Sequence, residues 1–342
     1  MDEPHRSGEL RRSRIKFLAR VGIALIVVVW GALYLKAESL GTNSENVAPE
    51  PVLSIEPGEL EDPEKLPSKP VITPTIALSF DGIAMLYPTK ENSRVWYSKW
   101  AKEKAKTLHS GDSDPVDREF VSRGDGAVYI QGDGTVRLEG DAPRMYVLDP
   151  AKNKKWNNVE VTIYAKRVSE YGSTSSQGIV IGARSEHQDA TEENPCFGAT
   201  YYGRLLYDGR AVFQKELIHE GSYSRNKPSE THKTKWNTVD ASMPSNVWIG
   251  VKFIVKSNPD GGSVKLELHR DLTDGKNGGA WEKVAEYTDR GDWSQINPGI
   301  DVQKICGYPA NKILLEPGTS VFIRNDEIKD AEYKLFSIRE IE

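Results

Sequence analysis

The sequence is poor in cysteine and lacks most of the short motifs that mark catalytic or metal sites. Its only cysteines are Cys196 and Cys306, and no histidines cluster near them in the chain, so we predict no metal site. The phosphate-loop, nucleophile-elbow and zincin patterns do not occur. The E-x-D-x-x-E pattern of laminarinase-like glycosidases is missing beyond residue 75, which argues against hydrolysis by the two carboxylates of that pattern.

A basic stripe is also missing. The net charge is −5 and the charges are spread along the chain, so we expect no binding to nucleic acid. The sequence does contain 29 glycines, 19 prolines, 8 tryptophans and 14 tyrosines, a composition typical of a turn-rich β protein. The chain of 342 residues has room for a membrane anchor, a spacer and one large domain.

A membrane anchor is predicted near the amino terminus. Val21–Leu35 is an uncharged apolar run, and Phe17–Ala19 extend it across Arg20 to about 19 residues, close to the length that crosses a bilayer. Basic residues dominate before this run and acidic residues follow it. The positive-inside rule therefore places residues 1–20 in the cytoplasm as a basic tail, residues 21–36 in the cell membrane as a single-pass helix, and the rest outside the cytoplasm. A cleaved secretory signal is the competing interpretation, although no clean small-x-small cleavage pattern follows.

Residues 37–74 have the composition of a disordered stalk. They hold seven prolines and eight acidic residues against two lysines, and they show no apolar periodicity. Such a segment cannot bury enough apolar surface to fold. We expect an extended spacer that lifts the following domain off the membrane.

Residues 75–342 have the pattern of an all-β domain. Val159–Arg167 and Val264–His269 alternate apolar and polar residues with a period of two. Further strand candidates are Ala127–Gln131, Thr135–Glu139, Met145–Leu148, Gly178–Ala183, Trp248–Val255, Val284–Tyr287, Val321–Arg324 and Lys334–Ile341. Turn pairs are Asp125-Gly126, Asp133-Gly134, Asp208-Gly209, Asp260-Gly261 and Gly278-Gly279. This spacing predicts a jelly-roll β-sandwich, with Trp96–Leu108 as its one helical segment.

The two cysteines are candidates for a disulfide. Both Cys196 and Cys306 lie in turn-rich segments of a domain that we place outside the cytoplasm, where disulfides persist. The alternative is two unpaired buried thiols.

Tyr201–His219 holds several candidate binding residues. If Asp208-Gly209 is a two-residue turn, the register of the hairpin puts Tyr202 opposite Lys215. The residues that this register places on one face are Tyr202, Arg204, Leu206, Phe213, Lys215, Leu217 and His219.

That face offers an aromatic ring, a phenol and three basic or titratable groups. A sugar needs an aromatic surface for its C–H groups and polar groups for its hydroxyls. A uronate also needs cations for its carboxylate, and arginine supplies a planar fork for it. The alternative is a solvated sheet face with basic side chains, and its two leucines allow it to be partly core.

A resemblance to a known family begins just upstream. Arg184-Ser185-Glu186, followed by Ile218-His219, resembles the R-[ST]-E-L-R and Q-[IV]-H strands of alginate-lyase-like jelly rolls in the concanavalin A-like lectin/glucanase group. In that family the arginine and the histidine bind or neutralise the uronate carboxylate, which implies this role for Arg184 and His219. The family's Y-F-K-A-G-x-Y strand has no counterpart, so no catalytic tyrosine is implied.

A second resemblance covers more of the chain. Residues 154–170, 248–255 and 321–341 are similar to a family of secreted or anchored microbial jelly-roll proteins described as lectin-like or lyase-like. This likeness implies fold and location more than activity.

Calcium is the one ion that the loops suggest. Jelly-roll lectins often hold calcium in acidic loops, and such loops occur at Asp112, Asp114 and Asp117 and at Asp125 and Asp133. No run has the spacing of an EF-hand, and solvated turn carboxylates are the alternative. We predict no other cofactor.

The sequence therefore predicts a membrane-anchored, lectin-like domain that binds polysaccharide, with the cell envelope as one source of the glycan. The candidate binding residues are Arg184, Glu186, Tyr202, Arg204, Lys215 and His219. Two alternatives stay open. One is a lyase that cleaves acidic glycans by β-elimination, in which the arginine and histidine stabilise the charge developing at the carboxylate carbon and a tyrosine moves the proton. The other is a structural envelope protein without a ligand.

Overall fold

The computed structural model describes residues 77–169, 178–191, 193–219, 222–225, 232–233, 236, 242–295, 299–309, 311–325 and 329–342. The predicted cytoplasmic tail (1–20), membrane anchor (21–36) and stalk (37–74) lie outside the described residues. Within the described ranges, every helix is too short or too polar to cross a membrane.

Strands dominate the described residues. They are β1 (Val95–Tyr97), β2 (Lys106–His109), β3 (Phe120–Ile130), β4 (Thr135–Leu148), β5 (Val159–Ser169), β6 (Gly178–Ser185), β7 (Thr200–Leu206), β8 (Arg210–Ile218), β9 (Ser222–Arg225), β10 (His232–Lys233), β11 (Trp248–Ser257), β12 (Val264–Asp271), β13 (Glu282–Asp289), β14 (Ser294–Gln295), β15 (Ser320–Arg324) and β16 (Asp330–Glu340). Short helices are η1 (Trp100–Lys102), η2 (His187–Asp189), η3 (Pro195–Gly198), η5 (Lys276–Gly278) and α2 (Val302–Cys306).

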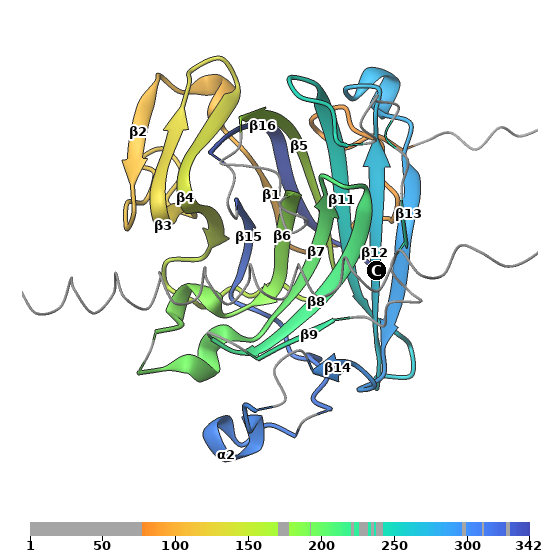
Figure 1. The fold of residues 1–342 in the computed structure, drawn as a ribbon. Helices are drawn as coiled ribbons and strands as arrows, with labels where there is room; N and C mark the ends of the chain where they lie inside the picture. The colour runs from red at the N-terminus through yellow and green to blue at the C-terminus, as the bar shows by residue number, and fades with distance from the viewer. Residues whose placement is uncertain are drawn as a thin grey trace, which may run out of the picture. The chain divides into compact units, whose positions relative to one another are not determined.

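These strands form one sheet that folds back on itself (Figure 1). The order along its main path is β13–β12–β11–β5–β16–β4–β15–β6–β7–β8–β9–β14. Across the fold, β7 packs on β11 and β12, and β8 packs on β13. The predicted β-sandwich is confirmed, because two layers of antiparallel strands face each other across one core.

The core lies between the two layers. Alternate residues of each strand point into it, as the period-two pattern requires, and Phe213 of β8 stacks on Phe253 of β11 with ring centroids 6.2 Å apart. Gly203 of β7 faces the opposite layer at close range: a Cβ at this position would lie 2.6 Å from the Phe253 ring. A glycine is required there because any side chain would collide with the opposite layer.

Most of the expected strands are confirmed, and two local predictions are wrong. Trp96–Leu108 forms β1, η1 and β2 in place of one helix. Trp96 of the paired strand β1 and Trp100 at the start of η1 both pack on Phe120 and Phe336, an arrangement that one continuous helix does not provide. Asp125-Gly126, predicted as a turn, instead lies inside the long strand β3. The pairing of β3 with β4 shifts by one residue there.

The predicted register of the β7–β8 hairpin is also wrong. The connecting loop has three residues, with Gly209 at a φ of 86° and the backbone N–H of Arg210 donating to the Asp208 side chain at 3.1 Å. A three-residue loop shifts the register by one, so Tyr202 pairs with Gln214 and Tyr201 pairs with Lys215. Because side chains alternate, this shift moves every β8 residue to the face opposite the predicted one.

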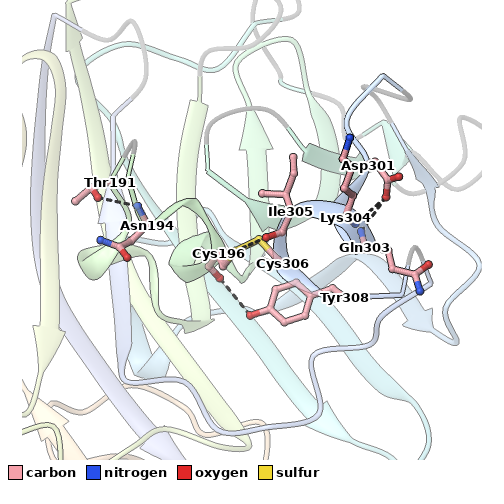
Figure 2. The surroundings of a disulfide bond; sticks show 9 residues. All are labelled: Thr191, Asn194, Cys196, Asp301, Gln303, Lys304, Ile305, Cys306 and Tyr308. Atoms are coloured by element: carbon pink, nitrogen blue, oxygen red, sulfur yellow. Dashed lines mark hydrogen bonds between the residues drawn. A yellow bond between two sulfur atoms is a disulfide. The ribbon is translucent and has the colours of Figure 1, made fainter.

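The disulfide between Cys196 and Cys306 is confirmed, with the two Cα atoms 5.5 Å apart (Figure 2). It joins η3 to the end of α2. The Asp301 side chain caps α2 by accepting from the backbone N–H groups of Gln303 and Lys304, and Tyr308 donates to the Cys196 carbonyl at 3.3 Å.

Candidate functional site

The layer formed by β4, β15, β6, β7 and β8 has a second face, turned away from the core, which we call the outer face. Its apolar members form a cluster of their own: Val121, Tyr146, Leu148, Val180, Tyr202 and Phe322. Cross-strand pairing aligns Tyr146, Phe322, Gly182 and Tyr202 in one row. A Cβ at Gly182 would lie 2.3 Å from the Phe322 ring, so this glycine leaves room for Phe322 to lie over β6.

Two histidines and a glutamate lie beside this row, and we call them the His–Glu–His cluster. His187 begins η2, Glu216 lies on β8 and His219 directly follows that strand. His219 Nδ1 is 3.1 Å from Glu216 Oε1, and His187 Nε2 is 3.6 Å from Glu216 Oε2. Two phenols support the cluster: Tyr202 donates to Glu216 Oε2, and Tyr146 Oη lies 3.0 Å from His187 Nδ1.

His187 is buried in an electropositive environment. It is only 3% exposed, and its backbone N–H donates to Ser185 Oγ at 3.0 Å. Burial lowers the pKa of His187 to about 2, with further contributions from the positive charges of Arg144 and Arg324 and from His219. Burial also raises the pKa of the Tyr146 phenol well above its ordinary value. Both groups are therefore neutral near pH 7.

Three arginines stand side by side on the outer face, and we call them the arginine row. Arg123 of β3 pairs with Arg144 of β4, and Arg144 pairs with Arg324 of β15. Arg123 and Arg144 are partly exposed, and Arg324 is buried. Within the described part of the chain, Arg144 has no ion-pair partner, and its buried Nε has no hydrogen-bond partner. Like charges directly opposite one another destabilise a sheet, and in the described residues no carboxylate offsets the charge of Arg144.

The row continues toward β7. The Arg324 guanidinium lies over the Tyr202 ring, 4.8 Å from its centroid. Val180 of β6 pairs with Arg324 on one side and with Arg204 of β7 on the other. Arg204 donates to Gln214 Oε1 at 2.7 Å. Four arginines from four strands therefore lie on the same face.

Of the six residues predicted from the sequence, Tyr202, Arg204 and His219 lie together on or beside the outer face. Arg184 does not belong to this group. A bulge in β6 gives Arg184 a φ of 47° and directs its side chain toward the end of the sandwich. There its five N–H groups donate to the carbonyls of Asn157, Leu314 and Leu315 and to the side chains of Asn158 and Ser257.

Lys215 also lies away from the predicted face. The register shift sends it into the core, where it is 1% exposed and its Nζ donates to Asp289 Oδ2 at 2.8 Å. Burial lowers the pKa of Lys215, and the Asp289 carboxylate partly offsets that effect. Glu186 is partly exposed, near Lys155 at 4.0 Å, and it lines a pocket with Arg184 at the end of the sandwich. Neither Arg184 nor Lys215 therefore lies on the outer face.

Four of the five aspartates proposed for calcium accept hydrogen bonds from groups of the protein. Asp114 is fully buried and accepts from Lys106 Nζ at 2.5 Å, and Asp117 accepts from Trp96 Nε1 at 2.9 Å. Asp112 and Asp133 accept backbone N–H groups of their own turns. Within the described ranges, these aspartates do not gather into a group of three or more ligating side chains; His187, Glu216 and His219 do.

A pocket of about 600 Å³ lies elsewhere, near β1. Trp96, Tyr97 and Phe80 line it, and Phe80 is 83% exposed with its ring 5.6 Å from that of Tyr97. Its polar side chains include Asp117 and Lys99, which pair with each other at 3.6 Å.

No protein-family model and no curated protein matches this chain. Among solved structures, the VIP36 exoplasmic/lumenal domain with Ca2+ and Man3GlcNAc is 13% identical and has a TM-score of 0.36, covering 70% of this chain and 91% of its own. The Lotus tetragonolobus seed lectin is 10% identical with a TM-score of 0.33, covering 69% and 96%. The botulinum neurotoxin serotype D binding domain is 14% identical with a TM-score of 0.30, covering 75% and 47%. At this level of similarity the likeness bears on neither ligand nor activity.

Proposed function

We propose that the domain binds an anionic polysaccharide on its outer face. The observation that carries the proposal is the arginine row: three guanidinium groups on adjacent strands, with no carboxylate paired to Arg144 in the described residues. Like charges directly opposite one another destabilise a sheet, and an anion bound beside Arg144 would offset this repulsion. Arginine binds carboxylates, the anionic groups of uronates, through two parallel hydrogen bonds.

An extended glycan suits this arrangement better than a small anion. The four arginines come from β3, β4, β15 and β7 and cross the layer as a line. Arg324 and Arg204 are buried, and the partly exposed Arg123 and Arg144 are the members that a chain of acidic sugars can contact. The sequence resemblance to lectin-like and lyase-like jelly rolls supports a glycan as the class of ligand. Arg144 and Arg123 are the partly exposed members that meet the ligand first.

We also propose that residues 21–36 anchor the protein in the cell membrane, with the domain outside the cytoplasm. The support is the distribution of basic residues before Val21 and of acidic residues after Leu35. Protease added to intact cells should release a fragment that begins within residues 37–74. Cleavage confined to the first 20 residues would show the opposite orientation.

Two assays on the full chain in detergent separate the three functional alternatives. An array of neutral and acidic polysaccharides should show binding to acidic members only, with affinity that falls as salt rises because exposed ion pairs are screened. A rise in ultraviolet absorbance from unsaturated uronate products would replace the binding proposal with the lyase. No binding and no absorbance change over all the glycans would favour a structural protein.

A further inference from the structure

The Nε2 atom of His187 is a buried polar atom without a hydrogen-bond partner. Its nearest polar neighbour in the cluster, Glu216 Oε2, is 3.6 Å away, too far for a hydrogen bond. The other ring nitrogen, Nδ1, lies 3.0 Å from Tyr146 Oη. If Nδ1 carries the proton and donates to Tyr146, the lone pair of Nε2 points toward a carboxylate oxygen, and a cation between them would satisfy both.

The third ligating group completes the geometry. His219 Nδ1 is 3.1 Å from Glu216 Oε1, and the ligating atoms of all three side chains lie within 4.8 Å of one another. Bonds of about 2.0–2.2 Å in a tetrahedral zinc site place neighbouring ligand atoms about 3.3–3.6 Å apart. His187 Nε2 and His219 Nδ1 approach different oxygens of Glu216, at 3.6 and 3.1 Å, and the three ligating atoms lie up to 4.8 Å apart. Rotation of the side chains must therefore shorten the longest of these separations when an ion binds.

We propose that His187, Glu216 and His219 bind one first-row transition-metal dication, with zinc as the ion whose usual ligand set they match. Two histidines and one glutamate leave a fourth position open. The phenols of Tyr146 and Tyr202 orient His187 and Glu216 from outside, as hydrogen-bonding groups around metal ligands commonly do. The sequence predicted no metal site because 28 residues separate His187 from Glu216 and no local motif joins them.

Nearby arginines affect what fills the fourth position. Arg144 and Arg324 make the surroundings of His187 electropositive, which weakens the binding of a bare dication. An anion at the open position offsets that charge. In the isolated protein, chloride from the buffer would be this anion. When a glycan is bound to the outer face, an acidic group of the glycan would be this anion.

The test titrates the metal alone, so its outcome is independent of glycan binding. The full chain in detergent is stripped with a chelator and titrated with Co2+ in chloride buffer, and Zn2+ is then added. We expect one Co2+ per chain with the visible absorption of four-coordinate Co2+, and its displacement by one Zn2+. His219→Gln and Glu216→Gln should each weaken Zn2+ binding at least tenfold.

His109→Gln is the matched control, because His109 is an exposed histidine on β2, and it should bind as the parent does. His219 is chosen over His187 because its side chain is 15% exposed, so the variant should fold; circular dichroism checks this. Absence of a one-to-one complex in the parent, or equal affinity in the parent and the folded His219→Gln variant, would overturn the metal site.

Discussion

Glu160 of β5 is a buried carboxylate held between two cations. Lys252 Nζ lies 2.7 Å from Oε1 and Arg339 Nη2 lies 2.8 Å from Oε2, and all three residues are at most 2% exposed. The backbone N–H groups of Leu86 and Tyr87 also donate to Oε2, each at 3.1 Å. Burial alone would raise the pKa of Glu160, but the charges of Lys252 and Arg339 outweigh it and hold the pKa below its ordinary value.

The ion-pair network of Glu160, Lys252 and Arg339 predicts how the stability of the protein changes with pH. Because the pKa of Glu160 is lower in the folded than in the unfolded state, its contribution is complete above the unfolded pKa of about 4.3 and is lost as the pH falls through the folded value. Glu160→Gln should destabilise the protein by about 3–5 kcal/mol at pH 7, because it leaves two buried cations without their carboxylate. Urea unfolding at pH 7, 5, 4 and 3 measures both effects.

Relative to the parent, Glu160→Gln should lose less stability between pH 5 and pH 3. Glu91→Gln is the control, since Glu91 is exposed, and its unfolding curves should follow the parent at every pH. If the free energy of unfolding of Glu160→Gln falls as steeply between pH 5 and pH 3 as that of the parent, Glu160 does not contribute to the loss of stability in acid.

For single strands, the period-two pattern predicted correctly which side chains face the core. The length of the β7–β8 loop, and with it the register of the hairpin, was predicted wrongly. The alternation in Val159–Arg167 correctly predicted which side chains of β5 face the core. It could not show that the opposite face is covered as well, because Leu86 and Tyr87 come from a distant segment. The register of β7 and β8 depended on whether the loop holds two residues or three, and the pair Asp208-Gly209 is compatible with both.

The approach of the two layers at Gly203 gives a prediction for these elements. Gly203→Ala would place a Cβ 2.6 Å from the Phe253 ring and 2.9 Å from Leu268, so β7 or β11 must shift. We expect a loss of about 1–3 kcal/mol, the usual cost of overpacking a core. Gly262→Ala, where the nearest atom is 4.0 Å away, should change stability by less than about 0.5 kcal/mol. Equal unfolding midpoints for the two variants in urea would contradict this close packing.

At the scale of the whole domain, the candidate site comes from segments far apart in the chain. Tyr202, Arg204 and His219 could be found from the sequence because they lie in one hairpin. Arg144, Arg324 and His187 could not, because strand pairings over long sequence distances bring β4, β15 and η2 together. A period-two pattern says which face a residue takes, but it does not say which strands are neighbours.

The disulfide is the one long-range link that the sequence did predict, because the chain has only two cysteines. It spans 110 residues, for which the chain-entropy model gives about 4–5 kcal/mol of stabilisation. The double variant Cys196→Ser/Cys306→Ser should lose a few kcal/mol in urea unfolding. A peptide map without reductant should show the two cysteines joined in the parent. Unchanged stability of the double variant would mean that the linked segments are held by other contacts.

The most direct test of the account concerns Arg144. Hexasaccharides of alginate, pectate and heparin are first compared, and the one that binds the full chain most tightly is chosen. Its dissociation constant is then measured by calorimetry at low and at physiological salt. Arg144→Gln should weaken binding by about tenfold or more, or about 1.4 kcal/mol, because it removes a charge-assisted contact. Arg290→Gln removes an exposed arginine outside the arginine row, and Tyr97→Ala alters the pocket near β1; both should bind as the parent does. Unchanged affinity in Arg144→Gln, or a loss confined to Tyr97→Ala, would contradict the outer face as the glycan site.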